Sequence, residues 1–166
     1  LTGFNCSLKG FRVTLLEKEA ELGGLLRFAA IPSFKEELKT YLAYLKAELG
    51  RHGVEVLLSE PATVGRLQEM SPDAVVVATG SSFADPGIEG AQQSHVRRVT
   101  DVLVDPSLAG QRVLVAGGSA MGCELAVQLA AQGRDVTLVE MLPELAVDLA
   151  GVVRPALLDM VEASGV

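Results

Sequence analysis

The sequence predicts an α/β protein with Rossmann-like, three-layer architecture, in which helices cover both faces of parallel sheets. Two observations lead to this fold class. A short segment occurs twice in the chain, and each copy has the pattern of a strand that ends in an acidic residue. In addition, a glycine-rich loop lies directly between an apolar strand and a helical stretch. A hydrophobic content of 49% with only 4% aromatic residues agrees with strands that are buried on both faces.

The repeat relates residues 10–17 to residues 133–140. When both copies are extended by five residues, they are identical at seven of thirteen positions. Each predicted buried strand ends in a glutamate, which is Glu17 in the first copy and Glu140 in the second. The second strand of a dinucleotide-binding βαβ unit ends in the same way, and its carboxylate binds the ribose hydroxyls of an adenine nucleotide. Two copies therefore predict two nucleotide sites and electron transfer between two cofactors.

The second copy carries a complete nucleotide-binding pattern, with a strand expected at residues 111–116 and a helix at about residues 121–132. The loop between them consists of Gly117, Gly118, Ser119, Ala120, Met121 and Gly122. We expect its amides and the helix dipole to face a pyrophosphate. Glu140 lies 18 residues after Gly122, near the spacing of a ribose-binding acid. Ser119 replaces the second glycine of the pattern, which predicts weaker binding; alternatively, the glycines serve only helix–strand packing.

The first copy lacks such a loop. If the loop of the first copy had the same spacing from its acid as in the second copy, the loop that belongs to Glu17 would precede the first residue. Residues 1–7 are too short for a strand, loop and helix. We therefore expect the chain to be a fragment of a larger enzyme. Residues 1–110 would be part of an FAD-binding domain with its connection, and residues 111–166 the N-terminal half of an NAD(P)-binding Rossmann domain.

Charge and cysteine content exclude several classes of function. A net charge of −7 argues against nucleic acid or an anionic membrane as a partner, and no apolar run reaches membrane-spanning length. Cys6 and Cys123 form no C-x-x-C pair, so a redox dithiol, a zinc site or an iron–sulfur cluster held by this chain alone is not expected. Cys123 follows a predicted helix start, but its apolar neighbours favour a buried structural thiol over a reactive one. We expect a cytoplasmic protein with no catalytic or metal-binding residue in this chain.

Between the repeats, Ser33 and Glu36 have the spacing of a capping box, and the helix that follows is expected to reach about residue 50. Its buried face is predicted to contain Leu38, Tyr41, Leu42, Leu45 and Leu49. A strand at residues 54–57 and a short helix at residues 64–70 should follow.

Residues 73–80 have the pattern of a buried strand that delivers Thr79 and Gly80 at its carboxyl end, where open α/β sheets bind ligands. The next segment, residues 81–110, contains Asp85-Pro86-Gly87 and is rich in proline and glycine. It is the expected connection between two domains.

These motifs resemble the pyridine-nucleotide-disulfide-oxidoreductase-type portion of the bacterial NADH:flavin oxidoreductase family, from about residue 9 onward. That family includes 2-enoate reductase, 2,4-dienoyl-CoA reductase and trimethylamine dehydrogenase. The resemblance is carried by residues 13–18 with 22–24, 75–80, 117–124 and 139–146. The last of these stretches is closest to the 2-enoate reductases.

The resemblance implies an FAD domain that is interrupted by an NAD(P)-binding insertion. It also implies FMN and an iron–sulfur cluster in an N-terminal barrel outside this chain, where an activated C=C bond is reduced or an amine is oxidised. Its implied FAD-site residues are Glu17, Gly24, Ala62, Thr79 and Gly80, and its implied NAD-site residues are Gly117, Gly118, Ser119, Ala120, Met121, Gly122 and Glu140.

The leading interpretation is a flavin-dependent oxidoreductase of the NADH oxidase or enoate reductase type, whose partners are a nicotinamide nucleotide and the remainder of the parent enzyme. NADH is favoured over NADPH, because Glu140 would repel a 2′-phosphate and the next residues supply no arginine. Two alternatives are a glutamate-synthase-like electron-input module and a non-catalytic nucleotide-binding or scaffold fragment. The fragment alone is expected to be inactive and colourless, and an exposed sheet edge would permit self-association.

Overall fold

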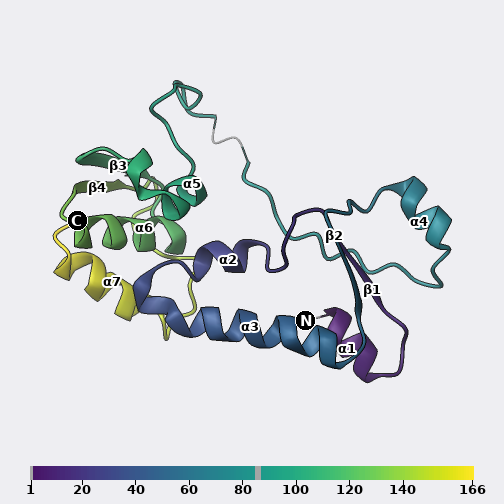
Figure 1. The fold of residues 1–166 in the computed structure, drawn as a ribbon. Coiled ribbons are helices and arrows are strands. Elements are labelled where there is room, and N and C mark those ends of the chain that lie inside the picture. Colours follow the sequence, from purple (N-terminus) through teal and green to yellow (C-terminus); the bar gives the residue numbers. More distant parts are fainter. Residues whose placement is uncertain (1, 85–86) are drawn as a thin grey trace. The chain divides into compact units, whose positions relative to one another are not determined.

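The computed structural model describes residues 2–84 and 87–166 and divides into two compact units. Unit 1 comprises Leu1–Arg27 and Glu37–Phe83, and unit 2 comprises Phe28–Glu36 and Ala84–Val166. Each unit contains one two-stranded parallel sheet (Figure 1). The predicted α/β class with parallel strands is therefore confirmed. Asp85 and Pro86 of the predicted connection lie outside the described residues.

The strands are β1 (Thr14–Glu17), β2 (Glu55–Leu58), β3 (Arg112–Ala116) and β4 (Asp135–Val139). The helices are α1 (Thr2–Leu8), α2 (Leu25–Ala29), α3 (Glu36–Arg51), α4 (Val64–Met70), α5 (Val99–Val104), α6 (Ala120–Ala131) and α7 (Arg154–Ala163). Short 3₁₀ turns lie at Ser33–Lys35 and Pro106–Leu108.

In unit 1, β1 and β2 pair in parallel, with Glu17 opposite Leu58 at their carboxyl ends. The first copy of the repeat thus forms a strand, although its side chains are half-buried rather than buried. Helix α1, for which no element was predicted, packs beside β1 and α3. A Cβ at Gly3 would lie 3.7 Å from Leu15 Cδ1 and 3.8 Å from Leu49 Cδ2.

The start and the buried face of α3 differ from the prediction. Pro32, not Ser33, is the N-cap of the 3₁₀ turn that precedes the helix, and no side-chain capping bond forms there. The predicted capping box is therefore wrong. Leu49 is buried and the three other leucines of the predicted face are half-buried, but Tyr41 is exposed and stacks with Tyr44, another exposed residue, at a ring-centroid distance of 6.4 Å. Both tyrosines can lie at the surface because a phenol ring keeps its hydroxyl in water.

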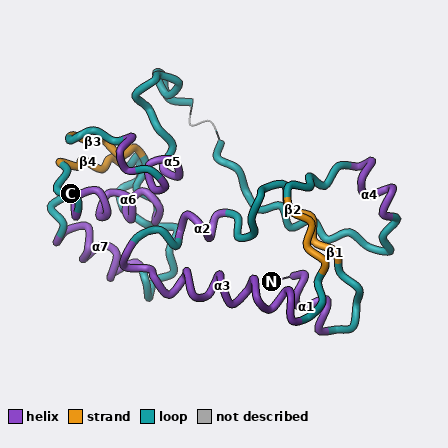
Figure 2. Tube along the Cα trace, viewed as in Figure 1, coloured by secondary structure: helices purple, strands orange, loops and turns teal. Residues whose placement is uncertain are grey.

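The predicted buried strand at residues 73–80 is also wrong. These residues are exposed and no strand pairing includes them within the described part of the chain, where they follow α4 as a loop (Figure 2). Their run of β-branched residues has strand propensity, but a strand is stable only when a neighbouring strand pairs with its backbone.

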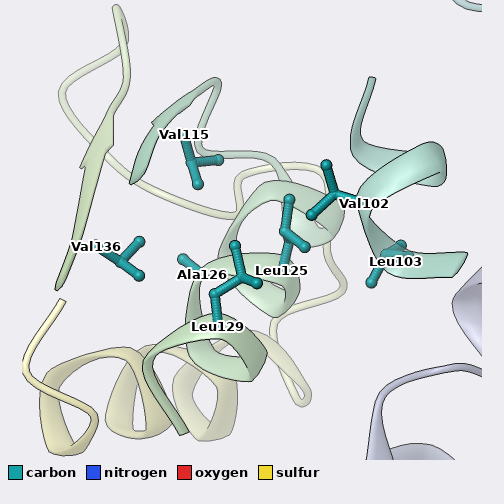
Figure 3. Close-up of a cluster of buried hydrophobic side chains, with 7 residues drawn as sticks. All are labelled: Val102, Leu103, Val115, Leu125, Ala126, Leu129 and Val136. Carbon is teal, nitrogen blue, oxygen red and sulfur yellow. The ribbon is translucent and has the colours of Figure 1, made fainter. Parts of the chain in front are cut away.

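Unit 2 is built around the β3–α6–β4 segment, in which β3 and β4 pair in parallel from Arg112 with Asp135 to Ala116 with Val139. The helix predicted at residues 121–132 is confirmed within one residue, and Gly133 follows its end with a φ of 80° that suits glycine. The main hydrophobic core consists of Val102, Leu103, Val115, Leu125, Ala126, Leu129 and Val136. In this core, the side chains of α6 lie between those of the two strands and those of α5 (Figure 3).

Helix α5 is an element that the sequence did not predict, because it is short and lies inside the segment taken as a connection. Its residues Val102 and Leu103 are 6% and 3% exposed, so this part of the segment belongs to the core of unit 2. The predicted boundary at residue 110 refers to cofactor-binding domains and stays a prediction, since the two compact units are defined by packing alone.

Leu129→Ala should lower the free energy of unfolding by about 3 kcal/mol, because Leu129 is fully buried and its truncation leaves a cavity in the core of unit 2. Leu114→Ala is the matched control, since Leu114 is 65% exposed on β3, and it should change this free energy by less than about 0.5 kcal/mol. Urea denaturation followed by circular dichroism measures both. Equal effects of the two substitutions would contradict this description of the core.

Candidate functional site

The loop of residues 117–122 turns the chain sharply from β3 into α6. Gly117 has a φ of 109°, which glycine adopts without strain, and its N–H donates to the carbonyl of Val139 at 2.9 Å. A Cβ on Gly122 would overlap the carbonyl oxygen of Gly117. Both glycines are therefore needed for the helix to begin directly against the strand end.

Glu140, the residue after β4, is hydrogen-bonded to this loop through its carboxylate. Its Oε2 accepts a hydrogen bond from the N–H of Gly118 at 2.6 Å, and its Oε1 accepts one from the N–H of Leu142 at 2.9 Å. The amide of Leu142, followed by that of Gly118, lowers the pKa of Glu140 because both stabilise the charged carboxylate. The predicted acid and the predicted loop are thus brought together.

The segment that follows Glu140 closes over the same loop. Ala146 donates its N–H to the carbonyl of Gly118 at 2.7 Å, and Leu145 Cδ2 fills the space that a Cβ on Gly118 would take. Asp148 Oδ1 accepts the N–H of Ala120, the first residue of α6, at 2.9 Å. Sequence reasoning missed Asp148, because no local pattern connects it to a helix that starts 28 residues earlier.

Cys123 is a buried structural thiol, as interpreted from its apolar neighbours. It is fully buried, and its Sγ donates to the carbonyl of Gly118 at 3.4 Å. Burial raises the pKa of this thiol, and the negative charges of Asp148 and Glu124 raise it further. Cys123 therefore helps to hold the loop and is not an activated nucleophile.

Unit 2 also contains an ion pair in which the carboxylate is buried. Glu124 on α6 pairs with Lys35, and the Glu124 side chain is 8% exposed. A carboxylate at that depth requires a partner, because leaving it uncompensated is strongly unfavourable. This pair was not predicted from the sequence, although the single charged residue of a mostly apolar helix was a usable signal for Glu124.

Glu17 repeats part of the geometry of Glu140 in unit 1. It ends β1, and its Oε1 accepts the N–H of Glu19 at 3.0 Å, as Glu140 accepts the amide two residues further along. The carbonyl of Glu17 accepts the N–H of Glu60 at 2.9 Å, which places the start of the segment that contains Ala62 at the same sheet edge. Ala62 is exposed.

The other predicted residues of the first site are less closely assembled. Gly24 precedes α2 with a φ of 50°, and a Cβ there would lie in open space. Thr79 and Gly80 are exposed, and in the described residues no strand pairing links their segment to β1. The neighbouring Gly23 is the sterically restricted glycine of this turn, since its Cβ would lie 2.8 Å from Arg27 Cγ and 2.9 Å from Leu42 Cδ1.

Residues 3–166 match the family described as pyridine nucleotide-disulphide oxidoreductase. The chain belongs to this family. It is 38% identical over 156 residues to a bilirubin reductase of Mediterraneibacter gnavus, covering 94% of this chain and 24% of that protein. It is 39% identical over 150 residues to an NADH oxidase of Thermoanaerobacter brockii, covering 88% of this chain and 23% of that protein.

A cinnamate reductase of Clostridium sporogenes is 37% identical over 135 residues, covering 81% of this chain and 20% of that protein. The solved structure of a 2-naphthoyl-CoA reductase with 2-naphthoyl-CoA shares the fold with a TM-score of 0.89 at 24% identity, covering 98% of this chain and 25% of that one. The chain spans about a quarter of the length of its relatives. These relatives are oxidoreductases by name, as the sequence predicted.

Residues 2–84 and 87–166 provide neither a membrane-spanning helix nor a metal cluster. None of the helices there combines the length and apolar character needed to cross a membrane. In the same residues, histidine, cysteine, aspartate and glutamate side chains do not gather into a group of three or more that could hold a metal ion.

Gly122→Ala should lower the free energy of unfolding by about 2 kcal/mol, because the new methyl group would collide with the Gly117 carbonyl and force the loop away from α6. Gly65→Ala is the control. Gly65 lies in α4 and has open space where the methyl group of an alanine would lie. This substitution should therefore raise the free energy of unfolding by about 0.5 kcal/mol. Thermal unfolding of both variants measures the difference, and two changes of the same sign would contradict the tight turn.

The pKa of Glu140 predicts a specific pH dependence of stability. Because folding lowers this pKa from its ordinary value of 4.5, the carboxylate stabilises the fold fully above that value and loses its contribution as the pH falls through the lowered pKa. Wild type should therefore exceed Glu140→Gln in stability at neutral pH, and the difference should disappear in acid. Glu162→Gln, an exposed position on α7, is the matched loss of one charge. A wild-type advantage that persists unchanged at low pH would contradict the assignment.

Proposed function

We propose that this chain binds NAD(H) with residues 117–122 and Glu140, as a nucleotide-binding part of a flavin-dependent oxidoreductase. The observation that carries the proposal is the 2.6 Å hydrogen bond between Gly118 N–H and Glu140 Oε2. It places a carboxylate directly beside a glycine turn at a strand-to-helix junction, in a chain of the pyridine nucleotide-disulphide oxidoreductase family.

The residues at this junction fit the two chemically different parts of a dinucleotide. A carboxylate has about four acceptor positions, so the two amides that Glu140 already binds leave capacity for ribose hydroxyls. The amide of Ala120 at the start of α6 already holds a carboxylate oxygen of Asp148, so this position accepts an anion. Ala120 and its neighbours in the loop would hold the diphosphate, and Glu140 would hold the adenosine ribose.

A second nucleotide site, for FAD, is part of the proposal. It would use Glu17 on the ribose, Gly24 near the pyrophosphate, and Ala62, Thr79 and Gly80 beside the adenine nucleotide. Support comes from the repeat. Glu17 and Glu140 both lie at the carboxyl end of a parallel strand, and each carboxylate accepts a hydrogen bond from the amide two residues later. The exposed position of Thr79 and Gly80 leaves their backbone accessible.

A bound nicotinamide would supply a hydride that a bound flavin could accept, while the residues of this chain would provide placement and electrostatics. The residues of this chain would bind and orient the nucleotides, and none is assigned a proton-transfer role. The sites for FMN, for an iron–sulfur cluster and for the organic substrate to be reduced would lie in other parts of a longer protein. This agrees with the quarter of the relatives' length that this chain spans. NAD(H) is favoured over NADP(H), because the negative Glu140 would repel a 2′-phosphate and no arginine follows it.

Isothermal titration calorimetry with NADH tests the proposal. Glu140→Ala should weaken binding at least about tenfold, because it removes charge-assisted hydrogen bonds to the ribose. Glu162→Ala removes the same charge from an exposed position of α7 and should leave the affinity unchanged. NADPH should bind wild type more weakly than NADH. Saturable binding that Glu140→Ala leaves intact would remove the ribose role.

A further inference from the structure

Asp148 occupies the position at the start of α6 where a nucleotide phosphate would bind. Ala120 is the first residue of this helix of 12 residues, and its N–H donates to Asp148 Oδ1 at 2.9 Å. The preceding Ser119 makes no side-chain capping bond. The helix end, which carries a partial positive charge, is therefore neutralised by a carboxylate from a segment far along the chain.

The backbone around Asp148 is fixed, whereas its side chain is exposed. Ala146 is fully buried with a φ of 51°, and its N–H donates to the carbonyl of Gly118 at 2.7 Å. Arg154 donates to the carbonyl of Leu145 at 2.8 Å and thereby holds the same segment from α7. Asp148 itself is exposed, so its side chain can rotate away from Ala120 while the buried anchor at Ala146 stays in place.

We infer that Asp148 is an autoinhibitory anion that competes with the diphosphate of a nicotinamide nucleotide for the N–H of Ala120. The inference rests on the proposed function of the same loop. A single N–H cannot serve the Asp148 carboxylate and a phosphate oxygen equally, and the two negative groups repel each other at that distance. Nucleotide binding then requires Asp148 to leave the helix end, which lowers the affinity that residues 117–122 would otherwise provide.

Calorimetry on the full chain tests this competition with NADH as the probe. Asp148→Asn and Asp148→Ala should each strengthen NADH binding about five-fold relative to wild type, because the competing charge is removed. Asp135→Asn is the matched control: it removes one charge from the opposite end of β4. Adenosine, which lacks a diphosphate, should bind wild type and both Asp148 variants alike in an NMR titration.

The outcomes separate this inference from the proposed function. If NADH binds in a Glu140-dependent way but Asp148→Asn behaves like Asp135→Asn, the competition is wrong and the nucleotide site stands. The competition is equally wrong if adenosine gains as much as NADH, because the effect would then be a general change of the loop. If neither wild type nor either Asp148 variant binds NADH, both the site and the competition are wrong.

Discussion

The close approach of a helix to a strand end is the constraint on which the loop of residues 117–122 depends. A Cβ on Gly122 would overlap the carbonyl oxygen of Gly117, so this junction admits no side chain at that position. The tight turn places the N–H of Ala120 at the start of α6, where it donates to Asp148, and it brings the N–H of Gly118 within 2.6 Å of Glu140 Oε2. The proposed binding of a diphosphate and a ribose would then depend on one steric condition rather than on a set of basic side chains.

This arrangement matters in a chain with a net charge of −7, whose overall field repels an anionic ligand. Fixed amide dipoles act over a short range and attract an anion without a basic side chain. Asp148 shows that the local field at Ala120 is attractive to an anion despite the charge of the whole chain. Burial, followed by the charge of the same carboxylate, raises the pKa of Cys123, so this part of the loop does not favour thiol chemistry.

The β3–α6–β4 segment could be predicted from the sequence because each of its signals is local. An apolar strand, a glycine turn and a helix that ends at Gly133 follow one another without interruption, and the observed α6 differs from the expected range by one residue at each end. The repeat made β1 predictable as well, and Glu17 accepts a hydrogen bond from the amide two residues later, as Glu140 does. In such elements the local preference agrees with the tertiary fold, and this agreement makes them predictable from the sequence.

The failures at residues 73–80, at α5 and at Asp148 have the opposite origin, since each depended on a partner distant in sequence. Residues 73–80 have the composition of a strand, but pairing requires another backbone, and none pairs with them in the described residues. Helix α5 is too short for its periodicity to be recognised, and it is defined by burial of Leu103 against α6. Asp148 is the clearest case, because its position at Ala120 is set by the burial of Ala146 beneath the loop. Spacing rules cannot find a carboxylate whose position depends on a buried residue such as Ala146. Even so, Asp148 lies at the N–H of Ala120, where the diphosphate of the predicted nucleotide would bind.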